Sequence, residues 1–133
     1  MTMKNIKVYQ PPGQPAQVAV FIEGLEPKLR DKLVRQIFYL SQTPPSELKE
    51  PHYKHFSIEK YQKFYELREK GRVVVRIIFT ICPDGGYLLL HAFVKKQKRD
   101  MMQALEHSLR LLAELREHPD CAVEYTVKEE KRT

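Results

Sequence analysis

Tryptophan is absent from this sequence and cysteine is scarce, with only Cys82 and Cys121 among 133 residues. The cysteines show no CxxC spacing and no neighbouring cluster of metal ligands, so the sequence indicates no zinc site, redox motif or disulfide framework. No apolar run suited to secretion opens the chain, and the longest apolar run, Tyr87–Val94, is far too short to span a bilayer. We therefore expect a cytoplasmic protein with reduced thiols, no bound metal and no membrane association.

Several catalytic motifs are missing as well. The chain holds no GxSxG, HExxH, P-loop or GxGxxG pattern. Its acidic residues lie mainly on expected helices and at turns, so the sequence does not indicate a nuclease site of converging carboxylates and metal ions. These enzyme classes find no support here, and we expect no small-molecule cofactor.

Positive charge is what the chain does have. The formal net charge is +6 and the pI is about 9.3, with 42% hydrophobic and 30% charged residues. That balance is typical of a globular domain, and the length suits a single domain over residues 1–133. The charge favours a polyanionic partner, nucleic acid first and an acidic protein second.

The centre of the chain predicts a meander of three antiparallel strands. Turn-forming residues at Lys70-Gly71 and at Pro83-Asp84-Gly85 separate runs rich in β-branched and aromatic residues. The expected strands are Lys63–Glu69, Arg72–Ile81 and Gly86–Lys95.

Alternation along the strands predicts two different faces. A tight loop at Asp84-Gly85 would pair Arg76 with Phe93 and Ile78 with His91. One face is then wholly apolar and must be covered by helices: Val73, Val75, Ile77, Phe79, Leu88, Leu90, Ala92 and Val94. The other carries Val74, Arg76, Ile78, Thr80, Leu89, His91, Phe93 and Lys95. Because Arg76 is costly to bury without a partner, we expect this second face to be open to solvent or to an anionic ligand.

The register of the first hairpin decides where Arg68 points. A two-residue loop at Lys70-Gly71 would send Arg68 and Arg76 to opposite faces. A three-residue loop with Gly71 at a positive φ would place Glu66 across from Arg76 and gather both arginines and Glu66 on one face. We favour the second register, because it leaves Tyr65 and Leu67 on the apolar face.

The flanking segments complete an α+β fold. It is a small antiparallel sheet with N-terminal helices packed on one face and a C-terminal helix. The expected elements are an edge strand at Lys4–Tyr9, helices at Ala16–Gly24, Lys28–Ser41 and Asp100–His118, and a possible last strand at Cys121–Val127 before a frayed tail, Lys128–Thr133. Their apolar stripes are Val18, Phe21 and Ile22; Leu29, Leu33, Ile37 and Leu40; and Met102, Leu105, Leu109 and Leu112. A strand remains possible for Ala16–Gly24, and Asp100 is the expected N-cap of the last helix.

The segment Ser46–Gln62 is expected to be a loop in which lysines and histidines alternate with Tyr53, Phe56 and Tyr61. Cations that meet phosphates and rings that meet bases suit RNA, with Lys60 as a candidate contact. The rings could equally hold the loop to the core, and the sequence does not decide between the two.

The remaining cluster of Arg, Lys and His suits metal-free RNA cleavage. In that reaction the 2′-hydroxyl attacks its own phosphodiester, a base takes its proton, cations stabilise the phosphorane and an acid protonates the leaving oxygen. Candidate RNA contacts at the sheet face and its exit are His91, Lys98 and Arg99. Each has a structural alternative: Arg76 pairs with Glu66, His91 is a core histidine, and Lys95–Arg99 is a solvated approach to a helix.

Three motifs occur in a characteristic order: FYELR (Phe64–Arg68), RIIF (Arg76–Phe79) and LLHAFVKK (Leu89–Lys96). Upstream, GQPAQVAVFIEGL (Gly13–Leu25) and PHYKHF (Pro51–Phe56) precede them. In this order and spacing the chain resembles the RelE/HigB branch of the RelE/ParE toxin superfamily, and within it the phage-derived toxin-like group. The resemblance extends over most of the chain.

The resemblance implies the toxin of a type II toxin–antitoxin pair, a metal-independent endonuclease that cleaves mRNA on the ribosome and is held inactive by a cognate antitoxin. It implies that Arg68 and Arg76 contact phosphate and stabilise the transition state. It also implies that Lys54 and Lys95 or Lys96 carry protons and bind phosphate. The alternatives are a ParE-like inhibitor of gyrase, a toxin-like protein that has lost activity, and a plain RNA-binding module.

Overall fold

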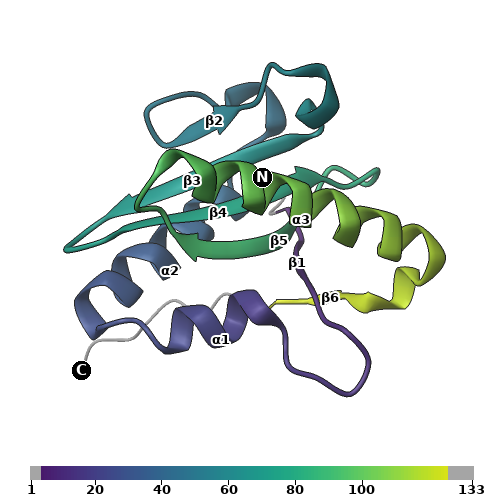
Figure 1. The fold of residues 1–133 in the computed structure, drawn as a ribbon, viewed down its shortest axis with the longest axis horizontal. Helices are drawn as coiled ribbons and strands as arrows, with labels where there is room; N and C mark the ends of the chain where they lie inside the picture. Colours follow the sequence, from purple (N-terminus) through teal and green to yellow (C-terminus); the bar gives the residue numbers. More distant parts are fainter. Residues whose placement is uncertain (1–3, 126–133) are drawn as a thin grey trace.

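The computed structural model describes residues 4–125, which form one six-stranded sheet with helices on both faces (Figure 1). The strand order is β2-β3-β4-β5-β1-β6; β1 runs parallel to β5, and the other neighbours are antiparallel. The strands are β1 (Ile6–Tyr9), β2 (Tyr53–His55), β3 (Phe64–Lys70), β4 (Val74–Ile81), β5 (Tyr87–Val94) and β6 (Ala122–Glu124). The helices are α1 (Gln17–Glu23), α2 (Pro27–Ser41) and α3 (Lys98–Glu117), with 3-10 turns at Pro45–Glu47, Glu59–Tyr61 and Pro119–Cys121. The predicted α+β class is confirmed.

Helices α1 and α2 cover one face of the sheet (Figure 1). The predicted stripe of α2 is buried in full, at Leu29, Leu33, Ile37 and Leu40. In α1, Val18 and Ile22 are buried and Phe21 packs beside them, so this segment is a helix and not a strand. These side chains form one cluster with Val75, Ile77 and Phe79 of β4. Since burial of each such side chain contributes about 1.5–3 kcal/mol, the cluster anchors both helices to the sheet.

Helix α3 covers part of the opposite face of the sheet, for which the sequence predicts exposure to solvent or to an anionic ligand. Ala104, Leu105 and Leu115 of α3 pack against Ile78 of β4 in a second cluster. The expectation of an open face is therefore wrong for this part of the sheet, because the strand residues here are apolar enough to hold a helix. Arg76 keeps partial access, with 18% of its side chain exposed.

A β-bulge corrects the predicted faces of three leucines. Ile78 pairs as expected, but the register shifts at the next position, where Phe79 faces Leu89. The extra residue in β5 is Leu90. Leu89 consequently joins the α1–α2 cluster, while Leu88 and Leu90 join the α3 cluster. One inserted residue reverses the facing of every residue beyond it, and nothing in the apolar run Tyr87–Val94 signals its position.

The hairpin of β3 and β4 closes through a three-residue loop, residues 71–73. Arg68 lies directly across from Arg76, whereas Glu66 lies across from Ile78. The predicted three-residue loop is confirmed, but the predicted pairing of Glu66 with Arg76 is wrong by two residues, because a loop of this length pairs Arg68 with Arg76. Gly71 also lacks the predicted positive φ, which in residues 4–125 occurs at Gly13 and Gly85. The gathering of Glu66, Arg68 and Arg76 on one face is nevertheless confirmed, since a shift of two positions in the pairing preserves facing.

Two strands differ from expectation. Strand β1 is not at the edge of the sheet, because β6 pairs with it on the outside. The segment expected to be a loop contains β2, which pairs with β3 and forms the other edge. Of the expected last strand, Ala122–Glu124 is confirmed, while the part beyond residue 125 and the predicted frayed tail lie outside the described residues.

The N-cap of helix α3 lies three residues before the predicted Asp100. Its N-cap is Gln97, and Asp100 is the third helical residue of a capping box in which each side chain binds the other's backbone. Met102, expected in the apolar stripe, is 46% exposed, and Ala104 and Leu115 are buried instead. None of the helices in residues 4–125 is long and apolar enough to cross a membrane.

Candidate functional site

A cluster of three cations surrounds one carboxylate on strands β2, β3 and β4. Lys54 lies across from Glu66, and Arg68 lies across from Arg76. Directly opposed residues project to the same side of a sheet, so all four share the face on which α3 packs. We call these four residues the arginine cluster.

Glu66 is the centre of the arginine cluster. Its side chain is fully buried, and its Oε2 accepts a hydrogen bond from a terminal nitrogen of Arg76. The Nε of Arg68 lies 3.6 Å from the other carboxylate oxygen. A single buried carboxylate therefore holds two neighbouring guanidinium groups, which would otherwise repel each other.

The two arginines keep capacity for a further ligand. A guanidinium has five N–H donors. In the described part of the chain the Nε atoms of Arg68 and Arg76 are buried without a hydrogen-bond partner, and the Nε of Arg68 faces Glu66, so a further ligand would meet the terminal nitrogens of these side chains. Arg68 is the more accessible, with 32% of its side chain exposed against 18% for Arg76. Paired, partly exposed guanidinium groups are suited to bidentate binding of a phosphate.

The aromatic residues near Lys54 are structural. Tyr53, Phe56 and Tyr61 are all buried. Of the two alternatives for these rings, packing against the core is therefore confirmed. Lys54 itself is half-buried, and its Nζ lies 5.6 Å from the centroid of the Phe56 ring. Contact with that ring face holds the ammonium group on the face of the arginine cluster.

Lys60 belongs to a different group of contacts. Its Nζ lies 2.7 Å from the carboxylate of Glu106 on α3, which also accepts the hydroxyl of Tyr61. Hydrogen bonds from these two donors lower the pKa of Glu106, and the same carboxylate raises the pKa of Lys60. The structure thus gives Lys60 a role in attaching the Glu59–Tyr61 turn to α3.

The remaining predicted lysines surround the start of α3. The backbone N–H of Lys95 donates to Val74 across the sheet, at 2.8 Å. The carboxylate of Asp100 accepts the backbone N–H groups of Lys96 and Gln97, at 2.8 and 2.9 Å, and these bonds lower the pKa of Asp100. The loop is therefore fixed by its backbone, which leaves its basic side chains to solvent: Lys95 half-exposed, and Lys96, Lys98 and Arg99 exposed.

His91 lies outside the arginine cluster, in a second group of residues that includes His107 of α3. Its ring is 4.7 Å from that of His107 on α3, edge to face, and stacks beside Phe93 at 5.8 Å. Burial, followed by the charge of the His107 ring, lowers the pKa of His91 to about 4. His107 was not predicted; the signal was its place in a polar stripe at Gln103, His107 and Arg110, spaced four and three along α3.

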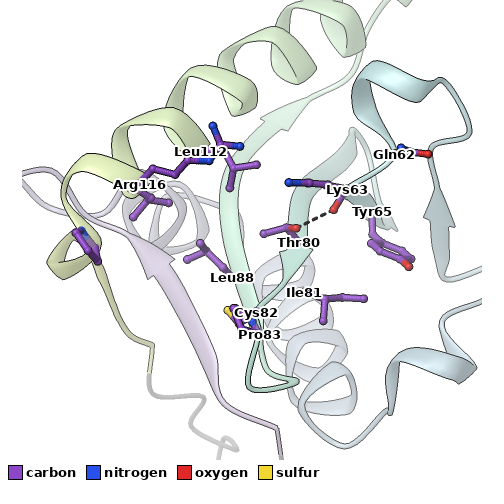
Figure 2. A pocket seen from close by; sticks show the side chains of 12 residues that line it. Gln62, Lys63, Tyr65, Thr80, Ile81, Cys82, Pro83, Leu88, Leu112 and Arg116 are labelled. Carbon is purple, nitrogen blue, oxygen red and sulfur yellow. Dashed lines mark hydrogen bonds between the residues drawn. The ribbon is translucent and has the colours of Figure 1, made fainter.

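Another pocket, of about 660 Å³, contains none of the predicted site residues (Figure 2). It lies between the β4–β5 hairpin and the C-terminal half of α3, with Leu112 and Leu88 on its walls. At its edge the Thr80 hydroxyl donates to the carbonyl of Lys63 at 2.7 Å. In the described residues no group of three or more His, Cys, Asp or Glu is placed to hold a metal ion.

A comparison with models of protein families shows the family of this chain. The model of the family "Phage derived protein Gp49-like (DUF891)" matches residues 20–117, well over half of the chain. The chain belongs to this family. The Gp49-like proteins are a RelE-like toxin family in the broad sense. A search of curated proteins found no match for this Gp49-like chain. The matched region includes the whole arginine cluster and all of α3.

Proposed function

We propose that this Gp49-like protein is the toxin of a type II toxin–antitoxin pair, of the RelE/HigB kind, and that it cleaves mRNA on the ribosome without a metal ion. Family membership supports a toxin-like protein. The observation that carries the step to RNA is the arginine cluster, in which Arg68 and Arg76 are direct cross-strand neighbours held by buried Glu66. Two fixed, partly exposed guanidinium groups match the charge and shape of a phosphodiester.

The residues divide into two roles in this proposal. Arg68 and Arg76 bind the scissile phosphate and stabilise the charge that develops on it, since a guanidinium with a pKa above about 12 does not shuttle protons. Lys54 on β2, and Lys95 or Lys96 after β5, are the candidate proton carriers. The 2′-oxygen loses its proton and bonds to phosphorus, the bond to the 5′-oxygen breaks, and that oxygen leaves protonated. The products are a 2′,3′-cyclic phosphate and a 5′-hydroxyl.

An acidic antitoxin is the proposed partner. The chain carries a formal net charge of +6. The exposed basic residues at the start of α3 follow β5, the strand next to β4 of the arginine cluster. An acidic segment laid over this surface would compete directly with RNA phosphate.

Cell-free translation with primer extension on the message tests the proposal. Wild type should cut only translated message, and Arg68→Ala should lower the cutting rate about 10²–10³-fold, the usual loss when one transition-state donor is removed. Arg116→Ala is the matched control, because Arg116 is an exposed arginine on α3 away from the arginine cluster. Circular dichroism checks that each variant is folded.

Other results would refute the nuclease reading. Intact message at inhibitory protein concentrations would direct attention to gyrase, measured by supercoiling. Growth inhibition that survives both Arg68→Ala and Arg76→Ala in folded proteins would exclude the arginine cluster from the activity. Absence of any inhibition would identify a toxin-like protein without activity.

A further inference from the structure

A pocket of about 480 Å³ separates β5 from one flank of α3. Its walls are His91, Phe93 and Val94 from β5, and Asp100, Gln103, Ala104, His107 and Arg110 from α3. Its volume falls within the range of about 300–1,000 Å³ that small-molecule sites occupy. The arginine cluster uses none of these residues.

The pocket combines rings with polar groups that are not engaged. Along it the ring of His91 contacts two others, those of Phe93 and His107. The Nδ1 atom of His91 is buried without a hydrogen-bond partner in residues 4–125. Because its pKa is about 4, His91 is neutral near pH 7 and offers one donor and one acceptor nitrogen. A buried polar atom without a partner is costly, and a ligand that reaches it would remove that cost.

Gln103 and Arg110 define what such a ligand is. Both are exposed at the pocket, and Arg110 interacts electrostatically with Glu106 and His107 on the same helix. Arginine and glutamine side chains bind, in bidentate fashion, the N7 edge that only purines present: N7 and O6 of guanine, or N7 and N6 of adenine. Aromatic rings add base stacking, which is worth about 1–3 kcal/mol per base.

The pocket is linked to the arginine cluster through Phe93. Phe93 lies directly across from Arg76 on the neighbouring strand, and neighbouring strands are about 4.8 Å apart. One residue therefore contributes to the pocket wall while its cross-strand partner belongs to the cluster that would hold phosphate.

We propose that the pocket between β5 and α3 binds a purine base of the RNA whose phosphate the arginine cluster holds. The proposal rests on the proposed function for the identity of the ligand as RNA. It assigns Gln103 and Arg110 to the edge of the base and Phe93 and His107 to its faces. It makes this pocket the place where the protein distinguishes purine from pyrimidine near the cleavage site.

Histidine NMR of the full chain tests the proposal without any cleavage. The probes are GMP, AMP, CMP, UMP and inorganic phosphate, and the readouts are the imidazole signals. The purine nucleotides should move the signals of His91 and His107 but not that of His118, which is exposed after the last turn of α3. Arg110→Ala and Gln103→Ala should each weaken purine binding about 5- to 150-fold, since a bidentate base contact is worth about 1–3 kcal/mol. Arg116→Ala, with the same charge change on the same helix, should bind like wild type.

Two outcomes would overturn the proposal: equal shifts with CMP, UMP or phosphate, which would mean an anion site, and no shift of His91 and His107 with any nucleotide. The cleavage assay separates this failure from that of the proposed function. Purine binding without message cleavage by wild type would refute the nuclease alone. Cleavage by wild type without purine binding, or with the same base preference in Arg110→Ala, would refute the pocket alone.

Discussion

Substitution of Glu66 by Gln tests how the arginine cluster is held together. The change keeps the shape of the side chain but removes the one negative charge that faces Arg68 and Arg76. Loss of one partner of a buried ion pair costs about 3–5 kcal/mol, because the remaining charge is left buried and unpaired. The arginines are 32% and 18% exposed, and Gln can still accept a hydrogen bond, so we expect a loss at the lower end, about 3 kcal/mol.

Urea unfolding followed by circular dichroism at pH 7 measures this loss. Domains of this size have about 5–15 kcal/mol of stability, so Glu66→Gln should remain folded in water and unfold at a lower urea midpoint. The double variant Glu66→Gln, Arg76→Gln should lose less than the sum of the single variants, with a coupling energy of about 2 kcal/mol. Glu106→Gln provides the control, since the side chains of Glu106 and its ion-pair partner Lys60 are 41% and 59% exposed and its effect should be much smaller.

A loss below about 1 kcal/mol for Glu66→Gln, or strict additivity in the double variant, would refute the reasoning. Either result would mean that solvent, and not the buried carboxylate, compensates the two guanidinium groups. The proposed catalytic positioning of Arg68 by Glu66 would then have no energetic basis.

Two further predictions concern His91 and the α3 cluster. The pKa of His91 is lowered to about 4 in the folded protein against 6.5 in the unfolded chain, so the unfolded state binds more protons between those values and stability falls as pH drops through this window. After allowance for the partial exposure of the ring we expect about 1 kcal/mol less stability at pH 5 than at pH 7. Much of this pH dependence should vanish in His91→Gln. An unchanged pH dependence of stability in that variant would contradict the lowered pKa of His91. Leu90→Ala should lower the free energy of unfolding by about 3 kcal/mol, because Leu90 is buried under α3. Met102→Ala should lower it by under about 1 kcal/mol, because Met102 is 46% exposed. Urea midpoints in the reverse order would contradict the positions of the bulge and of the buried face of α3.

Local patterns in the sequence account for most of the elements. The spacing of Leu29, Leu33, Ile37 and Leu40 predicts α2 and its buried face correctly, because a 3.6-residue period places these positions on one side. The three strands of the meander also follow from their β-branched runs and turn residues, with boundaries displaced by one or two residues. The predicted pairs of Arg76 with Phe93 and of Ile78 with His91 are confirmed, but the predicted pairing of Cys82 with Tyr87 at the Asp84-Gly85 turn is wrong, because Ile81 pairs with Tyr87 there and the bulge at Leu90 offsets the difference of one residue.

Features that depend on contacts between separate elements were not predicted from the sequence. Strand β2 is only three residues long and owes its existence to the edge that β3 presents, so its own sequence carries little signal. The bulge at Leu90 and the loop at residues 71–73 are choices of register, which depend on how two strands pack beneath helices and not on either strand alone.

For the candidate site, the sequence alone determined the chemistry of the residues, and the periodicity of strands determined that Glu66, Arg68 and Arg76 share a face. The tertiary structure decided which of them meet. Lys54 lies opposite Glu66 because the segment expected to be a loop contains a strand. Lys60 forms an ion pair with Glu106, and His91 contacts the ring of His107, which lies 16 positions later in the chain. Facing is a property of one strand and can be derived from its sequence, but contact between elements depends on burial and packing of the whole chain.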